Sequence, residues 1–118
     1  MKPSLLIILI CTVAQVAAQD FKQHIQFLAS DSLHGRAPAT QDERKAATYV
    51  AEQLAQSGAT ITWQKVPFEK DSALNVLAFL DSKKDSTIVI SAHYDHMGYG
   101  GNKSNEILKK GIHPGADD

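Results

Sequence analysis

Residues 87–92 constrain the fold of this 118-residue chain more than any other segment. They read Thr-Ile-Val-Ile-Ser-Ala, an almost continuously apolar and β-branched run that is typical of a strand buried on both faces of a sheet. Residues 61–66 alternate between apolar and polar side chains up to Pro67, and residues 75–80 form another apolar run. Both patterns predict strands, so we expect three strands in this part of the sheet.

Two helices are predicted before these strands. The first is expected to begin at Asp20, with Gln23 as its capping partner. The second begins at Thr40, where Glu43 completes a T-x-x-E capping box, and Gly58 fits the left-handed position at its end. Helices followed by strands, one of them buried, predict an α/β fold with a mixed β-sheet flanked by helices.

Residues 1–18 have the pattern of a secretory signal peptide. Lys2 supplies a positive start, residues 5–13 are apolar but too short to span a bilayer, and small residues at 16–18 suit cleavage. Lipidation at Cys11 is a weaker alternative because a bulky residue precedes it. The protein is therefore expected to be secreted or periplasmic, with no stable membrane anchor.

The charge balance limits the classes of partner. Twelve basic and 13 acidic residues give a net charge of -1, which argues against binding to nucleic acid or an anionic membrane. The one cysteine, Cys11, falls in the predicted signal peptide, so no disulfide is expected within the chain. Stability would then rest on the core and on any bound metal.

Polar side chains follow the predicted buried strand directly. His93, Tyr94, Asp95 and His96 lie where α/β sheets carry their functional sites, at the carboxyl end of a strand. In extended backbone, residues two apart share a side, so Asp95 would accept a hydrogen bond from one nitrogen of His93. The other imidazole nitrogen would then be available to a metal. Taken alone, this spacing also fits solvated loop residues.

A second acidic pattern closes the sequence. Asp117 and Asp118 follow Gly115, which would allow the backbone to approach a site closely. Carboxylate oxygens combined with an imidazole suit zinc, manganese or cobalt, and one carboxylate can bridge two cations. An exposed acidic turn is the alternative for this pair in isolation.

In combination, the segments 88–98 and 115–118 resemble the co-catalytic zinc aminopeptidases of peptidase family M28. The stretch 28–36, Leu-Ala-Ser-Asp-Ser-Leu-His-Gly-Arg, is similar to the lead-in of bacterial members of that family. The resemblance implies a zinc-exopeptidase-like fold, two Zn²⁺ ions in the complete site, and a secreted metalloaminopeptidase. Its substrate would be a peptide with a free N-terminus.

The resemblance also implies roles for individual residues. His93 would be a ligand of one zinc, Asp95 the carboxylate that orients it for catalysis, and Asp118 the carboxylate that bridges both metals. Asp117 would be a neighbour of the site. Apart from the resemblance, sequence position makes His96 a candidate neighbour of the site and His113 a candidate for the substrate entrance, with an exposed loop histidine as the favoured alternative for His113.

The family's paired glutamates, which include the catalytic base, together with a further acidic ligand and a last histidine, would all follow Asp118. Residues 19–118 are therefore interpreted as the N-terminal portion of a peptidase domain, incomplete and inactive by itself. One departure from the bacterial pattern is that Ala39-Thr40-Gln41-Asp42 replaces a G-T-x-G-like segment. Because the helix start survives there, little functional consequence is expected.

Two other functions remain open. One is a non-catalytic binding ectodomain of the same fold, against which the retention of His93, Asp95 and Asp118 argues. The other is a glutaminyl-cyclase-like acyltransferase with a single zinc, which the adjacent aspartates Asp117 and Asp118 disfavour.

Several polar and aromatic residues are interpreted as structural. His34 and Arg36 are expected to tie their loop to the domain, and Trp63 and Phe68 to pack in the core. Alternation directs Tyr94 away from His93, which predicts a packing role for it.

Overall fold

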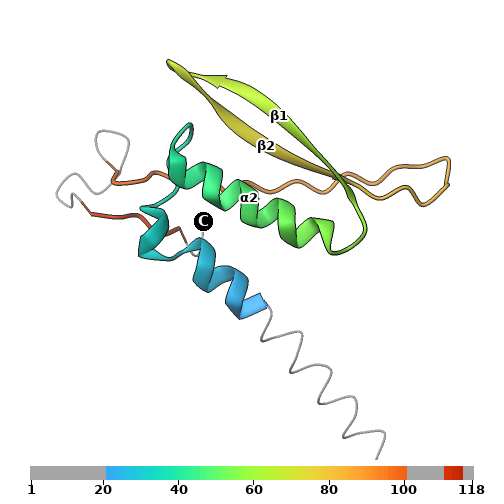
Figure 1. Cartoon of the computed structure of the whole chain (residues 1–118), viewed down its shortest axis with the longest axis horizontal. Coiled ribbons are helices and arrows are strands. Elements are labelled where there is room, and N and C mark those ends of the chain that lie inside the picture. The colour runs from blue at the N-terminus through green and yellow to red at the C-terminus, as the bar shows by residue number, and fades with distance from the viewer. Residues whose placement is uncertain (1–20, 101–110, 116–118) are drawn as a thin grey trace, which may run out of the picture.

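The computed structural model describes residues 21–100 and 111–115. A helical segment spans residues 21–28 and is followed by the 3₁₀ helix η1 (Asp31–Leu33) and the helix α2 (Gln41–Ala55) (Figure 1). Two strands follow, β1 (Thr60–Phe68) and β2 (Asp71–Phe79), which form one antiparallel sheet. The predicted combination of helices and a sheet is confirmed at this level. The predicted signal peptide and the cap at Asp20 lie outside the described residues.

The start of α2 follows from its capping residues. Thr40 has an extended backbone, and its side chain accepts a hydrogen bond from the backbone N–H of Glu43 at 3.2 Å. The Glu43 carboxylate is only 1% exposed, and its two oxygens accept from the backbone N–H groups of Ala39 at 2.9 Å and Leu74 at 2.7 Å. The predicted capping box is therefore present with one change. Glu43 reaches the residue before the cap and also binds β2.

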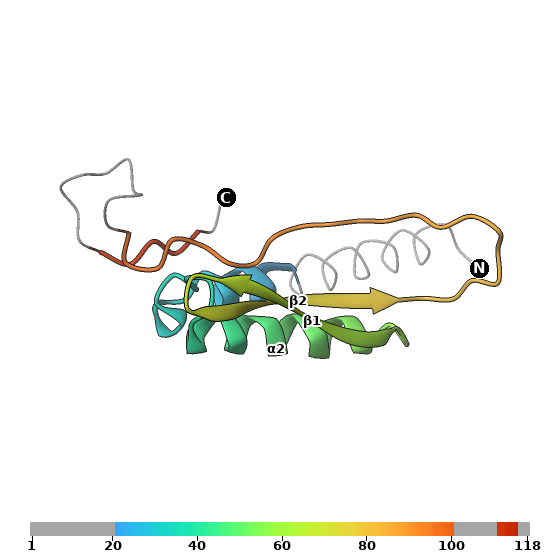
Figure 2. The same cartoon turned by 90° about the horizontal axis from the view of Figure 1, so that it is seen from above.

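Small side chains allow α2 to lie close along one face of the sheet (Figure 2). Ala46 and Ala47 are fully buried and Ala51 is 6% exposed, whereas the larger Leu54 is 38% exposed. Gly58 has the predicted left-handed backbone, with φ of 82°, but lies beyond the C-cap residue, Gln56. The end of α2 was thus predicted to within about two residues, the usual uncertainty of helix boundaries.

The strand pair is longer than the sequence predicts. β1 and β2 pair in continuous register from Thr60 opposite Phe79 to Phe68 opposite Asp71. Pro67 was expected to end β1, yet it stands opposite Ser72 inside the ladder. A proline is tolerated in an edge strand, since its missing N–H need not face a partner. The core position predicted for Trp63 is wrong, because that side chain is 46% exposed.

The third predicted strand is not formed in the described part of the chain. Residues 87–92 are extended but carry no strand hydrogen bonds, and Figure 2 draws them as a plain trace. Ile88, Val89 and Ile90 are 88%, 84% and 92% exposed, so the prediction of burial on both faces is wrong here. The β-branched run determines extended backbone locally. Burial additionally requires neighbouring strands, and the only described sheet is β1 with β2.

The first helical segment docks onto α2 through aromatic contacts. The rings of Phe27 and Tyr49 stack with centroids 4.0 Å apart, and the Tyr49 hydroxyl lies 2.7 Å from His24 Nδ1.

Within residues 21–100 and 111–115, no helix is long and apolar enough to cross a membrane.

Candidate functional site

Three segments that are distant in sequence meet at a junction made by residues 34–37, 94–98 and 113–115, here called the Arg36 junction. Backbone hydrogen bonds join them: His96 donates to the Arg36 carbonyl at 3.0 Å, and Gly98 donates to the Gly35 carbonyl at 2.8 Å. His113 in turn donates to the Gly98 carbonyl at 2.9 Å. The loop that follows residues 87–92 is thereby held against both other segments.

The Arg36 side chain fills the centre of this junction and is 3% exposed. Its Nε donates to the Tyr94 carbonyl at 2.7 Å, and its two terminal nitrogens donate to the carbonyls of Pro114 at 2.7 Å and Gly115 at 3.2 Å. A further bond goes to the Leu28 carbonyl. The structural role predicted for Arg36 is confirmed.

The charge of Arg36 persists in this buried position. Burial lowers the pKa of its guanidinium, and the negative charge of Asp95 partly offsets that effect. An arginine starts from so high a pKa that it stays protonated in proteins. Four carbonyl dipoles therefore face a permanent positive charge.

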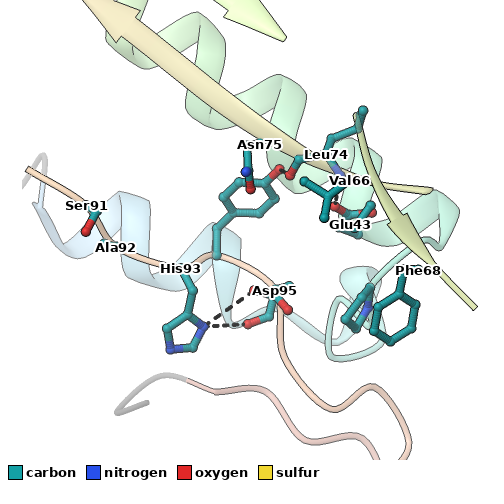
Figure 3. Close-up of a pocket in the computed structure, with 12 residues that line it drawn as sticks. Glu43, Val66, Phe68, Leu74, Asn75, Ser91, Ala92, His93 and Asp95 are labelled. Atoms are coloured by element: carbon teal, nitrogen blue, oxygen red, sulfur yellow. Dashed lines mark hydrogen bonds and ion pairs between the residues drawn. The ribbon is translucent and has the colours of Figure 1, made fainter. Parts of the chain in front are cut away.

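His93 and Asp95 are brought together at the edge of the junction (Figure 3). His93 Nδ1 lies 2.9 Å from the backbone oxygen of Asp95 and 3.7 Å from its carboxylate oxygen Oδ1. A carbonyl oxygen can only accept, so Nδ1 carries a proton; in the neutral tautomer Nε2 then has the lone pair. The predicted pairing is thus present, but the hydrogen bond goes to the main chain of Asp95 and the carboxylate stands behind it.

The other imidazole nitrogen of His93 is accessible. The His93 side chain is 58% exposed, so a cation can reach Nε2 from solvent. Metal-binding histidines commonly donate their second N–H to a carboxylate or a backbone carbonyl, which fixes the tautomer. The position of His93 is therefore compatible with the ligand role expected from the sequence.

A cavity of about 630 Å³ opens beside His93 and Asp95 (Figure 3). It lies between the loop 91–95, the start of α2 and the two strands, and its lining includes Val66, Phe68 and Leu74. Phe68 is half-buried in this lining, so the core position predicted for it is wrong.

Tyr94 is directed toward β2, as its alternation with His93 predicts. Its hydroxyl donates to the Leu74 carbonyl. Desolvation by burial raises the pKa of Tyr94 to about 12, and the negative charges of Glu43 and Asp95 act in the same direction. The packing role predicted for Tyr94 is confirmed.

His96 and His113 lie at the same junction, with ring centroids 6.3 Å apart. The His96 ring rests on Gly115, where a Cβ atom would come within 2.7 Å of the ring carbons Cγ and Cδ2. Gly115 also has a φ of 55°, so its backbone approaches His96 and Arg36 as only a glycine allows, whereas its approach to a metal site stays a prediction. His34 lies at the rim, 3.1 Å from the Asp42 carboxylate and stacked on Tyr99.

Two of the predicted site residues, Asp117 and Asp118, lie outside the described residues. Among residues 21–100 and 111–115, no three side chains of the metal-binding types gather closely enough to hold an ion. The described part of the chain therefore presents His93 as one candidate ligand and leaves its predicted partner Asp118 untested.

Comparison of the chain with protein-family models, with curated proteins and with solved structures gives no match.

The raised pKa of Tyr94 leads to a testable prediction. Because the folded value of about 12 exceeds the unfolded value of about 10, the tyrosine stabilises the fold fully below pH 10. That contribution is lost as the pH rises toward 12. In a spectrophotometric titration of phenolate absorbance, a Tyr94→Phe variant should lack the step near pH 12. The exposed Tyr99 provides the control, since Tyr99→Phe should retain the step near pH 12. If Tyr94→Phe also retains that step, the assignment of the raised pKa to Tyr94 is contradicted.

Proposed function

We propose that this chain is the N-terminal portion of a secreted, zinc-dependent aminopeptidase that removes N-terminal residues from peptides. The observation that carries the proposal is the orientation of His93. Its Nδ1 faces Asp95 at 2.9 Å from the backbone oxygen and 3.7 Å from the carboxylate, which leaves Nε2 toward solvent. The resemblance of residues 88–98 and 115–118 to zinc aminopeptidases supplies the chemistry that such a histidine would serve.

The donor set agrees with zinc as far as it is described. A neutral imidazole held by a main-chain acceptor is a common zinc ligand, and the nearby carboxylate increases its basicity. In this proposal His93 would hold one zinc and Asp118 would be shared between two, and the remaining ligands would follow Asp118. When bound, the metals supply Lewis-acid chemistry, polarising the scissile carbonyl and acidifying a water molecule.

The chain's own residues would have distinct tasks. Asp95 holds His93 in the tautomer that can bind a metal and stabilises positive charge beside it. The cavity between the loop 91–95 and the strands gives a peptide access to this edge of the site. Proton transfer to the leaving amine would fall to a glutamate that follows Asp118.

The test uses the secreted protein that contains this chain with its downstream sequence. Metal analysis is expected to find two zinc ions per molecule, and the protein should hydrolyse aminoacyl p-nitroanilides. A chelator should remove this activity and added zinc should restore it. A fully active preparation without zinc would overturn the proposal. One zinc per molecule with cyclisation of N-terminal glutamine would instead support the acyltransferase function.

A further inference from the structure

Arg36 connects the loop that carries His93 and Asp95 to the segment 113–115. One of its nitrogens binds the carbonyl of Tyr94, the residue between His93 and Asp95. Its terminal nitrogens bind the carbonyls of Pro114 and Gly115, which directly precede the segment 116–118. Because a guanidinium is planar and rigid, the positions of its donors fix the separation of these carbonyls.

The bond to Tyr94 also bears on the orientation of the His93 ring. The Tyr94 carbonyl belongs to the peptide group that joins Tyr94 to Asp95, so its bond to Arg36 fixes that peptide plane. The next carbonyl along the chain, that of Asp95, accepts the hydrogen bond of His93 Nδ1 at 2.9 Å. That carbonyl belongs to the Asp95–His96 peptide group, whose N–H donates to the main-chain carbonyl of Arg36 at 3.0 Å. The direction of the imidazole therefore depends on two consecutive peptide groups, one held by the Arg36 side chain and one by its main chain.

The acceptors of Arg36 indicate what it does in the junction. All four described bonds go to main-chain carbonyls: those of Leu28, Tyr94, Pro114 and Gly115. A buried charge satisfied in this way holds backbones in place, since every loop that moves away leaves a donor unpaired. The Leu28 carbonyl lies at the end of the first helical segment, so this bond anchors the guanidinium to the body of the fold.

We infer that Arg36 is a positioning residue that sets the loop carrying His93 and Asp95 against the segment 113–115. The inference rests on the proposed metal site for its functional meaning. Its structural part, the alignment of two loops through one side chain, stands on the hydrogen bonds alone.

Amide hydrogen exchange on the full chain tests the alignment. The N–H groups of His96, Gly98 and His113 bond across the junction. In an Arg36→Met variant their exchange should accelerate by at least about tenfold, the effect of losing charged hydrogen bonds, while the amides of α2 keep their rates. Arg36→Lys, which keeps the charge but not the planar fork, should give an intermediate acceleration.

Arg44 provides the matched control, since it is an exposed arginine paired with Asp71 at 3.0 Å. Arg44→Met should leave the three junction amides unchanged. If Arg36→Met accelerates exchange equally throughout the chain, Arg36 stabilises the fold in general and the inference is overturned. Unchanged exchange rates at the three junction amides would overturn it as well. Should Arg36→Met fail to fold, hydrogen exchange in the unmodified chain tests the same inference. Its Arg36 Nε–H proton should exchange slowly, and exchange as fast as that of Arg44 would overturn the inference.

Cobalt binding tests the functional part separately. With Co²⁺ as the probe of the complete secreted protein, Arg36→Lys should weaken binding by about 10–100-fold and shift the visible absorption bands, as loss of an orienting partner does. An unchanged spectrum and affinity would overturn the positioning of the metal site. If the unmodified protein binds no cobalt, the proposed function fails, while the exchange measurements still decide whether Arg36 aligns the loops.

Discussion

Replacement of His93 by alanine is expected to abolish aminopeptidase turnover in the complete protein, with a loss of about a hundredfold or more. This exceeds the 10–100-fold cost of removing an outer partner, because His93 itself would bind the metal. Zinc affinity, measured by competition with a chromogenic chelator, should fall in parallel. Circular dichroism should remain unchanged, since the His93 side chain is 58% exposed.

Two companion variants make this prediction specific. Asp95→Asn keeps the backbone carbonyl that lies 2.9 Å from His93 Nδ1 and removes only the charge of the carboxylate 3.7 Å away. It should therefore cost about tenfold in zinc affinity, the lower end of the range for such partners. His24→Ala is the control, because His24 bonds to Tyr49 at 2.7 Å outside the junction. Near-normal turnover in His93→Ala would refute the ligand assignment.

Among glycine-to-alanine substitutions at the described glycines, Gly35→Ala should lower the free energy of unfolding the most. A Cβ atom at Gly35 would lie 2.5 Å from the carbonyl oxygens of both Gly98 and His113 and 2.8 Å from Gly98 Cα. These are main-chain atoms, so none can rotate away. The φ of 71° adds the strain of a left-handed backbone, about 1–2 kcal/mol for a residue with a Cβ.

Gly58→Ala separates the two causes. Gly58 has a similar φ of 82°, but no atom lies within 4 Å of its added Cβ. It should show the backbone strain alone, whereas Gly35→Ala should lose an additional about 1–3 kcal/mol from overpacking. Urea denaturation followed by circular dichroism measures both free energies of unfolding. Equal losses in the two variants would mean that the junction opens without cost and would contradict its close packing.

The parts of the fold that the sequence predicted are those encoded locally. Thr40 and Glu43 predict the start of α2 because a cap needs only neighbouring N–H groups. The alternating pattern of residues 61–66 likewise predicts β1. Residues 87–92 show the limit of this reasoning. Their β-branched side chains predict extended backbone, but their burial depends on other segments, and Val89 is 84% exposed.

The candidate site was predicted as a set of side chains, and its main-chain acceptors were missed. The spacing of His93 and Asp95 predicted that the two residues lie together, but the predicted carboxylate acceptor is wrong. The hydrogen bond goes to a carbonyl, which every residue possesses and no sequence pattern reveals. The same holds for the four carbonyls around Arg36. The need for Gly35 was also missed, although a glycine beside a buried arginine is a signal of close backbone approach.

The two bonds at Leu74 have a consequence for how the sheet can grow. The N–H of Leu74 donates to Glu43 and its carbonyl accepts from Tyr94, so both of its main-chain groups are occupied by side chains. In an edge strand such groups are normally unpaired, so a strand of another chain can hydrogen-bond to them and cause aggregation. At this point β2 is closed to a further strand. Pairing with another chain would first have to displace a buried carboxylate and a phenol, so the middle of this edge is protected against unwanted strand addition.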